Sequence, residues 1–216
     1  MEFQTHRLSV QRTARVVQLG SVSDASEHWL IFHGYGQLSA YFLKHFEDLR
    51  SGRCFWAPEA LNRFYLEGLS GRVGAGWMTK EARLDDISDN MFYIDTVINQ
   101  IIRPQMTYGK KLHILAFSQG VATACRWIEI RRPLLDKLIL WAGMLPQDIS
   151  TDGLKEILKQ HRTTVVYGKN DPYLSDENLK SVSEFMIREA PEVEIRSYDG
   201  GHHFDKTLLS ELITRI

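Results

Sequence analysis

The pentapeptide Ala116-Phe117-Ser118-Gln119-Gly120 holds the residue best suited to covalent chemistry in this chain. It follows a strongly apolar run at 112–117 and opens a helical pattern. A sharp strand-to-helix turn lifts a serine hydroxyl clear of the backbone, and small residues two positions either side prevent clashes. Gly120 fits, and Ala116 replaces the usual first glycine with one additional methyl group. The pattern predicts Ser118 as a nucleophile, and the alternative is a serine that only caps a helix.

A serine hydroxyl is a weak nucleophile without a base, and two adjacent histidines could provide one. The segment Asp199-Gly200-Gly201-His202-His203-Phe204 lies just past the last predicted strand. Glycines before a histidine allow the loop to bring its ring back over the edge of a sheet. We predict His202 as the base. His203 is the competing candidate, and both could instead be surface loop histidines.

An aspartate that orients the histidine is expected on the loop after the preceding strand. Tyr167-Gly168-Lys169-Asn170-Asp171-Pro172 provides a strand end, a glycine turn and an aspartate stiffened by proline. Asp171 is therefore the predicted acid, although the same residue suits an ordinary turn. Asp176 competes, but an acid there would favour a helix start. Asp199 also competes, but we expect it to point away from the histidine.

Backbone N–H groups that stabilise an oxyanion are expected in two places. One is the N–H of Gln119, directly after the predicted nucleophile. The other comes from His33-Gly34-Tyr35-Gly36-Gln37, which follows an apolar run at 29–32. Glycines on both sides allow the backbone to turn the Tyr35 N–H inward. Taken alone, the segment could be only a glycine-rich turn.

These loops need a scaffold, and the chain offers strand-length apolar runs that alternate with helical patterns. Continuous apolar runs are typical of strands covered on both faces, as in a parallel sheet. Residues 8–10 and 14–19 are expected to form an opening antiparallel pair. The further expected strands are 29–32, 54–57, 112–117, 138–141, 163–167 and 193–198. The alternation predicts an α/β fold with a mostly parallel central sheet and helices on both faces.

Three helices are expected from apolar residues at three- and four-residue steps. The first spans 84–101 and ends near Pro104, and the second runs from Gln119 to Arg131. The third begins near Ser175, and its expected first turn and buried face comprise Asp176, Glu177, Leu179, Val182, Phe185 and Met186. Residues 58–80 contain four glycines among aromatic residues without a clean period, so we expect a long loop there, which is often functional.

Composition narrows the function further. The 216 residues are 44% apolar and 25% charged, with a formal net charge of −1, which fits one globular domain over 1–216 and argues against nucleic-acid binding. The polar start shows no secretory signal and no apolar run is long enough to span a bilayer, so we expect a cytoplasmic protein without membrane insertion. Cys54 and Cys125 are expected to be buried thiols, and no spacing indicates a metal or cofactor site.

Together these motifs resemble the carboxylesterase/phospholipase family of α/β-hydrolases, also called the acyl-protein thioesterase or predicted-esterase group. The most specific element is Phe117-Ser118-Gln119-Gly120, and the resemblance extends from His33-Gly34 to Gly201-His202. It implies an α/β-hydrolase fold without a large cap domain, a serine ester hydrolase that needs no cofactor, and a small acyl ester, lysophospholipid or thioester as substrate. The sequence differs from the family pattern at Ala116, at Val121 and in the 58–80 segment.

Several further residues could contact a substrate. Leu38, Trp77, Met78 and Leu145 could line an acyl pocket, although each could equally be a core residue. Arg63 and Arg72 could meet an anionic substrate group. A peptidase or another acyl hydrolase on the same fold, or a non-catalytic ligand-binding protein, remains an alternative. The oligomeric state is left open.

Overall fold

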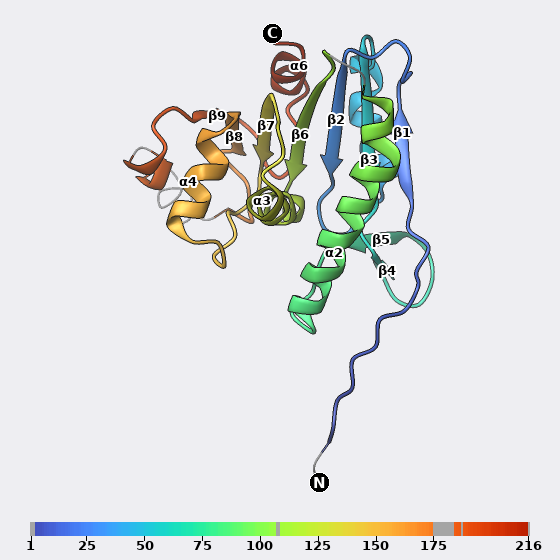
Figure 1. The fold of residues 1–216 in the computed structure, drawn as a ribbon. Helices are drawn as coiled ribbons and strands as arrows, with labels where there is room; N and C mark the ends of the chain where they lie inside the picture. Colours follow the sequence, from blue (N-terminus) through green and yellow to red (C-terminus); the bar gives the residue numbers. More distant parts are fainter. Residues whose placement is uncertain (1–2, 107–108, 175–183, 187, 216) are drawn as a thin grey trace.

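A seven-stranded sheet forms the centre of the protein in a computed structural model that describes residues 3–106, 109–174, 184–186 and 188–215 (Figure 1). The strand order is β1-β3-β2-β6-β7-β8-β9, and every neighbouring pair is parallel except β1 with β3. The strands of this sheet are β1 Val16–Leu19, β2 Glu27–Phe32, β3 Arg53–Pro58, β6 Lys111–Phe117, β7 Lys137–Trp141, β8 Arg162–Gly168 and β9 Glu194–Tyr198. The expected mostly parallel α/β sheet is confirmed.

Helices cover both faces of this sheet, which explains why its strands read as continuous apolar runs. In β2, Leu30 and Phe32 pack into one apolar cluster, and Trp29 and Ile31 pack into the other. The first cluster is completed by α2 (Arg83–Val97), α3 (Gln119–Arg131) and α4 (Thr151–Lys159). The second is completed by α1 (Ser39–Phe42), η1 (Leu43–Leu49) and α6 (Lys206–Thr214). Alternate side chains along one strand thus enter different cores.

The expected opening antiparallel pair is wrong. Residues 3–15 form no strand, and Leu8 and Val10 are largely exposed. β1 is antiparallel, as expected of this part of the chain, but its partner is β3. The sequence of residues 14–19 indicated the strand β1 but could not identify the strand beside it.

The expected long loop at 58–80 is also wrong. It contains a hairpin of β4 (Asn62–Tyr65) and β5 (Val73–Gly76), which pair antiparallel as a separate two-stranded sheet. The hairpin lies near the carboxyl ends of β2 and β3 (Figure 1). Its strands are four residues long and β5 contains two glycines, so neither gave a strand pattern in the sequence.

The predicted helices agree with the structure where it describes them. α3 has the predicted bounds, and the helix at 84–101 is α2 continued by the π-helical turn η2 (Ile98–Ile102) and the 3₁₀ turn η3 (Arg103–Gln105). Leu84 does not belong to its buried face, since it is 72% exposed. For the third helix, 175–183 lies outside the described residues, while Phe185 and Met186 pack on the first core as expected.

Both cysteines occupy the expected places, Cys54 buried in β3 and Cys125 buried in α3. Within the part of the chain that the structure describes, no helix combines the length and apolar character needed to cross a membrane.

Candidate active site

Ser118 occupies a strained turn between β6 and α3. Its backbone has φ 54° and ψ −121°, a conformation that costs a non-glycine residue on the order of 1–3 kcal/mol and persists only where the surroundings enforce it. Strand and helix approach closely here, because a Cβ on Gly120 would lie 2.7 Å from the Phe32 carbonyl oxygen. The Ser118 N–H donates to the Trp141 carbonyl at 2.9 Å, and this bond fixes the turn to β7. The turn has the strained strand-to-helix geometry predicted from the sequence.

The glycine usually found two residues before such a serine is replaced without disturbing this turn. Ala116 is fully buried in β6, in register with Phe32 on β2 and Leu140 on β7. Its methyl group packs into the first apolar core. The methyl group that Ala116 adds relative to glycine therefore becomes part of the core packing.

Three side chains from three different loops meet at the carboxyl edge of the sheet. Ser118 follows β6, Asp171 follows β8 and His202 follows β9. The His202 Nε2 atom lies 2.8 Å from Ser118 Oγ, and His202 Nδ1 lies 2.7 Å from Asp171 Oδ2. A carboxylate accepts the Nδ1–H proton, which leaves the Nε2 lone pair free to accept from the serine hydroxyl. The arrangement can activate the hydroxyl as a nucleophile.

The turn that contains Asp171 fixes the orientation of its carboxylate. Its side chain is fully buried, and Oδ1 accepts the Tyr173 N–H at 2.9 Å while Oδ2 accepts from His202. Burial and a second hydrogen bond restrict the carboxylate to one orientation. Gly168 is required at the start of this loop, because a Cβ there would lie 2.4 Å from the Gly200 carbonyl oxygen. That close approach brings the Asp171 and His202 loops side by side.

The competing candidates lie elsewhere or outside the described residues. The His203 side chain is exposed and faces Tyr198, with ring centroids 5.8 Å apart. Asp199 is exposed and pairs with Lys169 at 2.8 Å. Asp176 belongs to the segment 175–183, which lies outside the described residues.

Three backbone N–H groups of the candidate oxyanion loop have acceptors within the protein. The Gly34 N–H donates to Gln37 Oε1 at 2.7 Å, the Gly36 N–H to the Ala75 carbonyl at 2.8 Å, and the Gln37 N–H to the Gly34 carbonyl at 3.4 Å. Among the residues described, the Tyr35 N–H has no such acceptor. The loop thus leaves one donor free, at the position predicted from the sequence.

This loop lies directly against the serine. A Cβ on Gly34 would lie 3.1 Å from the Ser118 Cβ, closer than side chains normally pack. Gln119 is the first residue of α3, where helical geometry offers its N–H no acceptor within the helix. Within the described residues, one N–H group without an acceptor thus belongs to the residue after Ser118 and another to the loop that contacts Ser118, and such donors suit a developing negative charge.

His33 is a structural residue of the same loop. It is fully buried; its Nε2 accepts the Ala60 N–H at 3.0 Å, and its Nδ1 lies 2.7 Å from the Gly34 carbonyl. Burial lowers the pKa of His33, an effect that the Gly34 carbonyl and nearby Glu59 only partly oppose. A neutral ring with its proton on Nδ1 satisfies both contacts and fixes the loop.

No family model matches the sequence, and no curated protein is similar to it at the sequence level. Solved structures are similar in fold. A Zea mays acyl-protein thioesterase 2 superposes with a TM-score of 0.68 at 18% identity, covering 93% of this chain and 96% of that one. The esterase PE8 gives 0.70 at 16% identity, covering 95% and 100%. A Mesorhizobium loti carboxylesterase gives 0.71 at 13% identity, covering 94% and 95%. The chain has the α/β-hydrolase fold.

The four residues expected in an acyl pocket of this α/β-hydrolase fold differ in their surroundings. Trp77 does not line a pocket, because it is fully buried with its ring against Phe32 and its Nε1–H on the His33 carbonyl at 2.8 Å. Leu38, Met78 and Leu145 are partly exposed. Met78 directly follows Trp77, and its carbonyl accepts a hydrogen bond from Gln119 Nε2 at 2.7 Å, so it lies beside the turn that holds Ser118.

Two aromatic residues that the sequence did not single out contact the His202 ring. Phe117 and Tyr173 have centroids 4.9 Å and 4.7 Å from it. Phe117 directly precedes Ser118, and Tyr173 lies two residues after Asp171. The sequence around them does not indicate the direction in which either ring points. They hold the imidazole by packing while its nitrogens contact Asp171 and Ser118.

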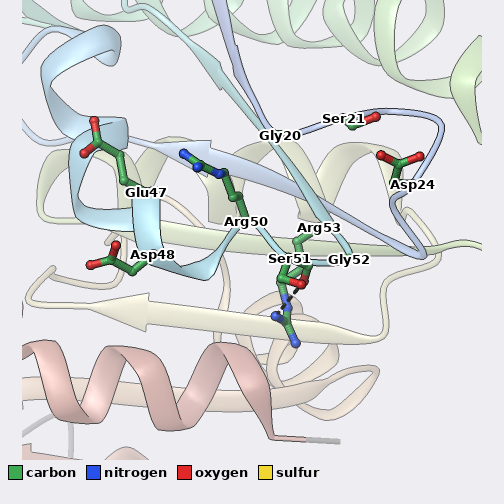
Figure 2. A pocket seen from close by; sticks show the side chains of 9 residues that line it. All are labelled: Gly20, Ser21, Asp24, Glu47, Asp48, Arg50, Ser51, Gly52 and Arg53. Atoms are coloured by element: carbon green, nitrogen blue, oxygen red, sulfur yellow. Dashed lines mark hydrogen bonds between the residues drawn. The ribbon is translucent and has the colours of Figure 1, made fainter.

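Two hollows lie at the edge of the sheet opposite to the one that carries Ser118, Asp171 and His202. The larger, about 590 Å³, is drawn in Figure 2, with Glu47 and Asp48 on one side and Asp24 on the other. These carboxylates do not converge, and the described residues contain no group of three side chains suited to a metal ion. The smaller, about 290 Å³, includes Lys137 and Glu194 at the amino ends of β7 and β9. Neither hollow contains a residue of the candidate active site.

Proposed function

We propose that this protein is a serine hydrolase of small carboxylic esters, with Ser118 as nucleophile, His202 as base and Asp171 as the orienting acid. The observation that carries the proposal is the continuous hydrogen-bonded series from Asp171 Oδ2 through the imidazole to Ser118 Oγ, with contacts of 2.7 and 2.8 Å. Fold alone does not determine activity, so the proposal depends on this geometry.

The proposed reaction proceeds through an acyl-enzyme. His202 Nε2 takes the Ser118 proton as Oγ attacks the ester carbonyl carbon, and the proton then passes to the leaving alcohol. A water molecule, deprotonated by the same nitrogen, attacks the acyl-enzyme and releases the acid. Asp171 stabilises the imidazolium formed in each half of the reaction. Ser118 is partly accessible, which allows an ester to reach it.

The oxyanion that forms in both steps would be stabilised by the N–H groups of Gln119 and Tyr35. Their free state among the described residues supports this role. The amino end of α3 adds a partial positive charge at the same place. Loss of one such donor typically costs about 10²–10³-fold in kcat.

The charges near the hairpin favour an uncharged ester. Arg63, a candidate for an anionic group, contacts buried Glu59 at 2.7 Å, and Arg72 lies 3.7 Å from Glu67. Both guanidinium groups already have a carboxylate partner. Thioesters and lysophospholipids remain alternative substrates, because acyl transfer to serine does not depend on the leaving atom.

We also propose a reducing compartment, the cytoplasm, as the site of action. Burial raises the pKa of Cys54 to about 11 and that of Cys125 to about 12, so both thiols are protonated and unreactive at neutral pH. Each functions as a small core residue.

Hydrolysis of a panel of p-nitrophenyl esters of increasing acyl length tests the function. We expect turnover by the wild type and a loss of several orders of magnitude in Ser118→Ala, as in other enzymes that use such a triad. A thermal shift measured with the same esters separates the alternatives. Stabilisation by an ester without turnover would favour a non-catalytic binding protein and contradict the proposal.

A further inference from the structure

The side chain of Gln119 forms two hydrogen bonds to one stretch of backbone. Its Oε1 accepts the Trp77 N–H at 2.8 Å, and its Nε2 donates to the Met78 carbonyl at 2.7 Å. This amide thus pairs with residues 77–78 as a neighbouring strand would. The sequence suggested only a backbone role for Gln119, so this contact is an additional property of the same residue.

Residues 77–78 directly follow β5, and β5 is bonded to the other proposed oxyanion segment. The Gly36 N–H donates to the Ala75 carbonyl at 2.8 Å, and the Ala75 N–H donates to the Gln37 carbonyl at 3.2 Å. The backbones touch, since a Cβ on Gly74 would lie 2.4 Å from the Gly36 carbonyl oxygen. The conformation of Tyr35, immediately before Gly36, is thereby tied to β5.

The segment after β5 is a rigid support. Trp77 is fully buried and its indole N–H is bonded to the His33 carbonyl, while Asn90 on α2 donates to the Trp77 carbonyl at 2.5 Å. Residue 77 is therefore fixed from three directions, by Gln119, by His33 and by Asn90. A support held in this way can transmit the position of one loop to another.

We infer that the Gln119 side chain is a positioning residue, which acts through β5 to hold the two oxyanion donors in register. Its own N–H is one donor, and its side chain binds the residues directly after the strand that fixes the other donor, at Tyr35. The inference rests on the proposed function. It adds that the hairpin β4–β5 is part of the oxyanion machinery and that the Gln119 amide is one of the contacts that set its distance from the turn at Ser118.

Two variants and a matched control test the positioning role of Gln119. Activity is measured on a neutral p-nitrophenyl ester, and folding is checked by circular dichroism. Gln119→Met keeps the length of the side chain but removes both hydrogen bonds, and Gly74→Ala displaces Gly36 from the opposite end. We expect each to lower kcat about 10-fold or more with KM changed less than about threefold, because misplaced donors weaken only the transition state. Gln160→Met, the same change at an exposed residue after α4, is the matched control and should behave as the wild type.

Gln119→Glu supplies a readout that a purely structural role would not change. Only the protonated carboxyl can both accept from the Trp77 N–H and donate to the Met78 carbonyl. The ratio of its kcat to that of the wild type should therefore rise as the pH falls from about 8 to about 5.5, since the ratio removes the pH effects that both proteins share.

The results separate this inference from the proposed function. A folded Gln119→Met with wild-type kcat, a loss confined to KM, or a flat kcat ratio for Gln119→Glu would overturn the inference alone. Absence of Ser118-dependent turnover in the wild type would overturn the proposed function, and this inference with it.

Discussion

Tyr173 lies edge-on to the imidazole of His202, with ring centroids 4.7 Å apart and planes at 71°. Phe117 contacts the same ring, with centroids 4.9 Å apart, and so the imidazole packs against two aromatic side chains. Tyr173 also donates its backbone N–H to Asp171, which links the aromatic contact to the turn that carries the proposed acid. One residue thus restrains both members of the proposed His–Asp pair.

Tyr173→Ala should reduce kcat about three- to tenfold, because the imidazole loses a packing partner and samples orientations that do not face Ser118. Tyr173→Phe should keep wild-type activity, since the hydroxyl forms no hydrogen bond within the described part of the chain. Steady-state hydrolysis of a neutral ester checks both. Equal losses in the two variants would assign the effect to the hydroxyl and contradict this account.

Asp171→Asn should lower kcat by about 10³–10⁴-fold with little change in fold. The amide is similar in size, but its nitrogen cannot accept the His202 Nδ1 proton and favours the wrong tautomer. Circular dichroism and thermal melting establish that the variant is folded before its activity is compared. Activity within tenfold of the wild type would exclude Asp171 as the orienting acid.

The adjacent histidines provide a matched pair of variants. His202→Ala should abolish ester hydrolysis to the level of Ser118→Ala, whereas His203→Ala should retain most of it, because the His203 ring is exposed and faces Tyr198. The reverse result would make His203 the base and require a loop conformation different from the one described.

The burial of His113 leads us to predict how the free energy of unfolding depends on pH. It is fully buried in β6 and stacks on Trp29, with centroids 4.5 Å apart. Burial lowers its pKa to about 4, although acidic neighbours, including Asp136 at 3.7 Å, oppose the shift. The other charged groups that act on it are Glu27, which also raises the pKa, and Lys137 and Lys111, which lower it.

The folded pKa lies below the ordinary value of 6.5, so the unfolded chain binds a proton that the folded chain does not. The free energy of unfolding is therefore unaffected by this group above about pH 6.5 and falls as the pH drops toward 4. The loss amounts to about 2 kcal/mol at pH 5. Urea unfolding at several pH values should show a shallower decline in His113→Phe, which keeps the aromatic stack without the titration. Identical slopes in both proteins would contradict the assignment.

The sequence predicted the buried strands and α3 well because their apolar patterns are local and continuous. It missed α4 and α6, although each has a capping residue: the Ser150 side chain accepts the Gly153 N–H, and Asp205 Oδ1 accepts the Leu208 N–H. Gly153, a poor helix former, lies in the first turn of α4, and both helices are only nine residues long. Short capped helices of this kind depend on packing that no single segment reveals.

In the candidate site too, the residues marked by local sequence signals could be predicted, whereas contacts between distant segments could not. Ser118, Asp171 and His202 each sit in a turn with its own glycine or proline signal, so each could be located separately. The role of Trp77 could not, because its burial depends on contacts with β2 and α2 that lie far away in the sequence. The side-chain hydrogen bonds of Gln119 could not be predicted either, since they are formed with residues directly after a hairpin that the sequence did not indicate.

Labelling with a fluorophosphonate probe, followed by mass spectrometry of the modified peptide, is the most direct test of an activated Ser118. We expect one adduct, located on Ser118, that disappears in Ser118→Ala and forms far more slowly in His202→Ala. A folded wild-type protein that remains unlabelled, or an adduct on a different residue, would contradict it.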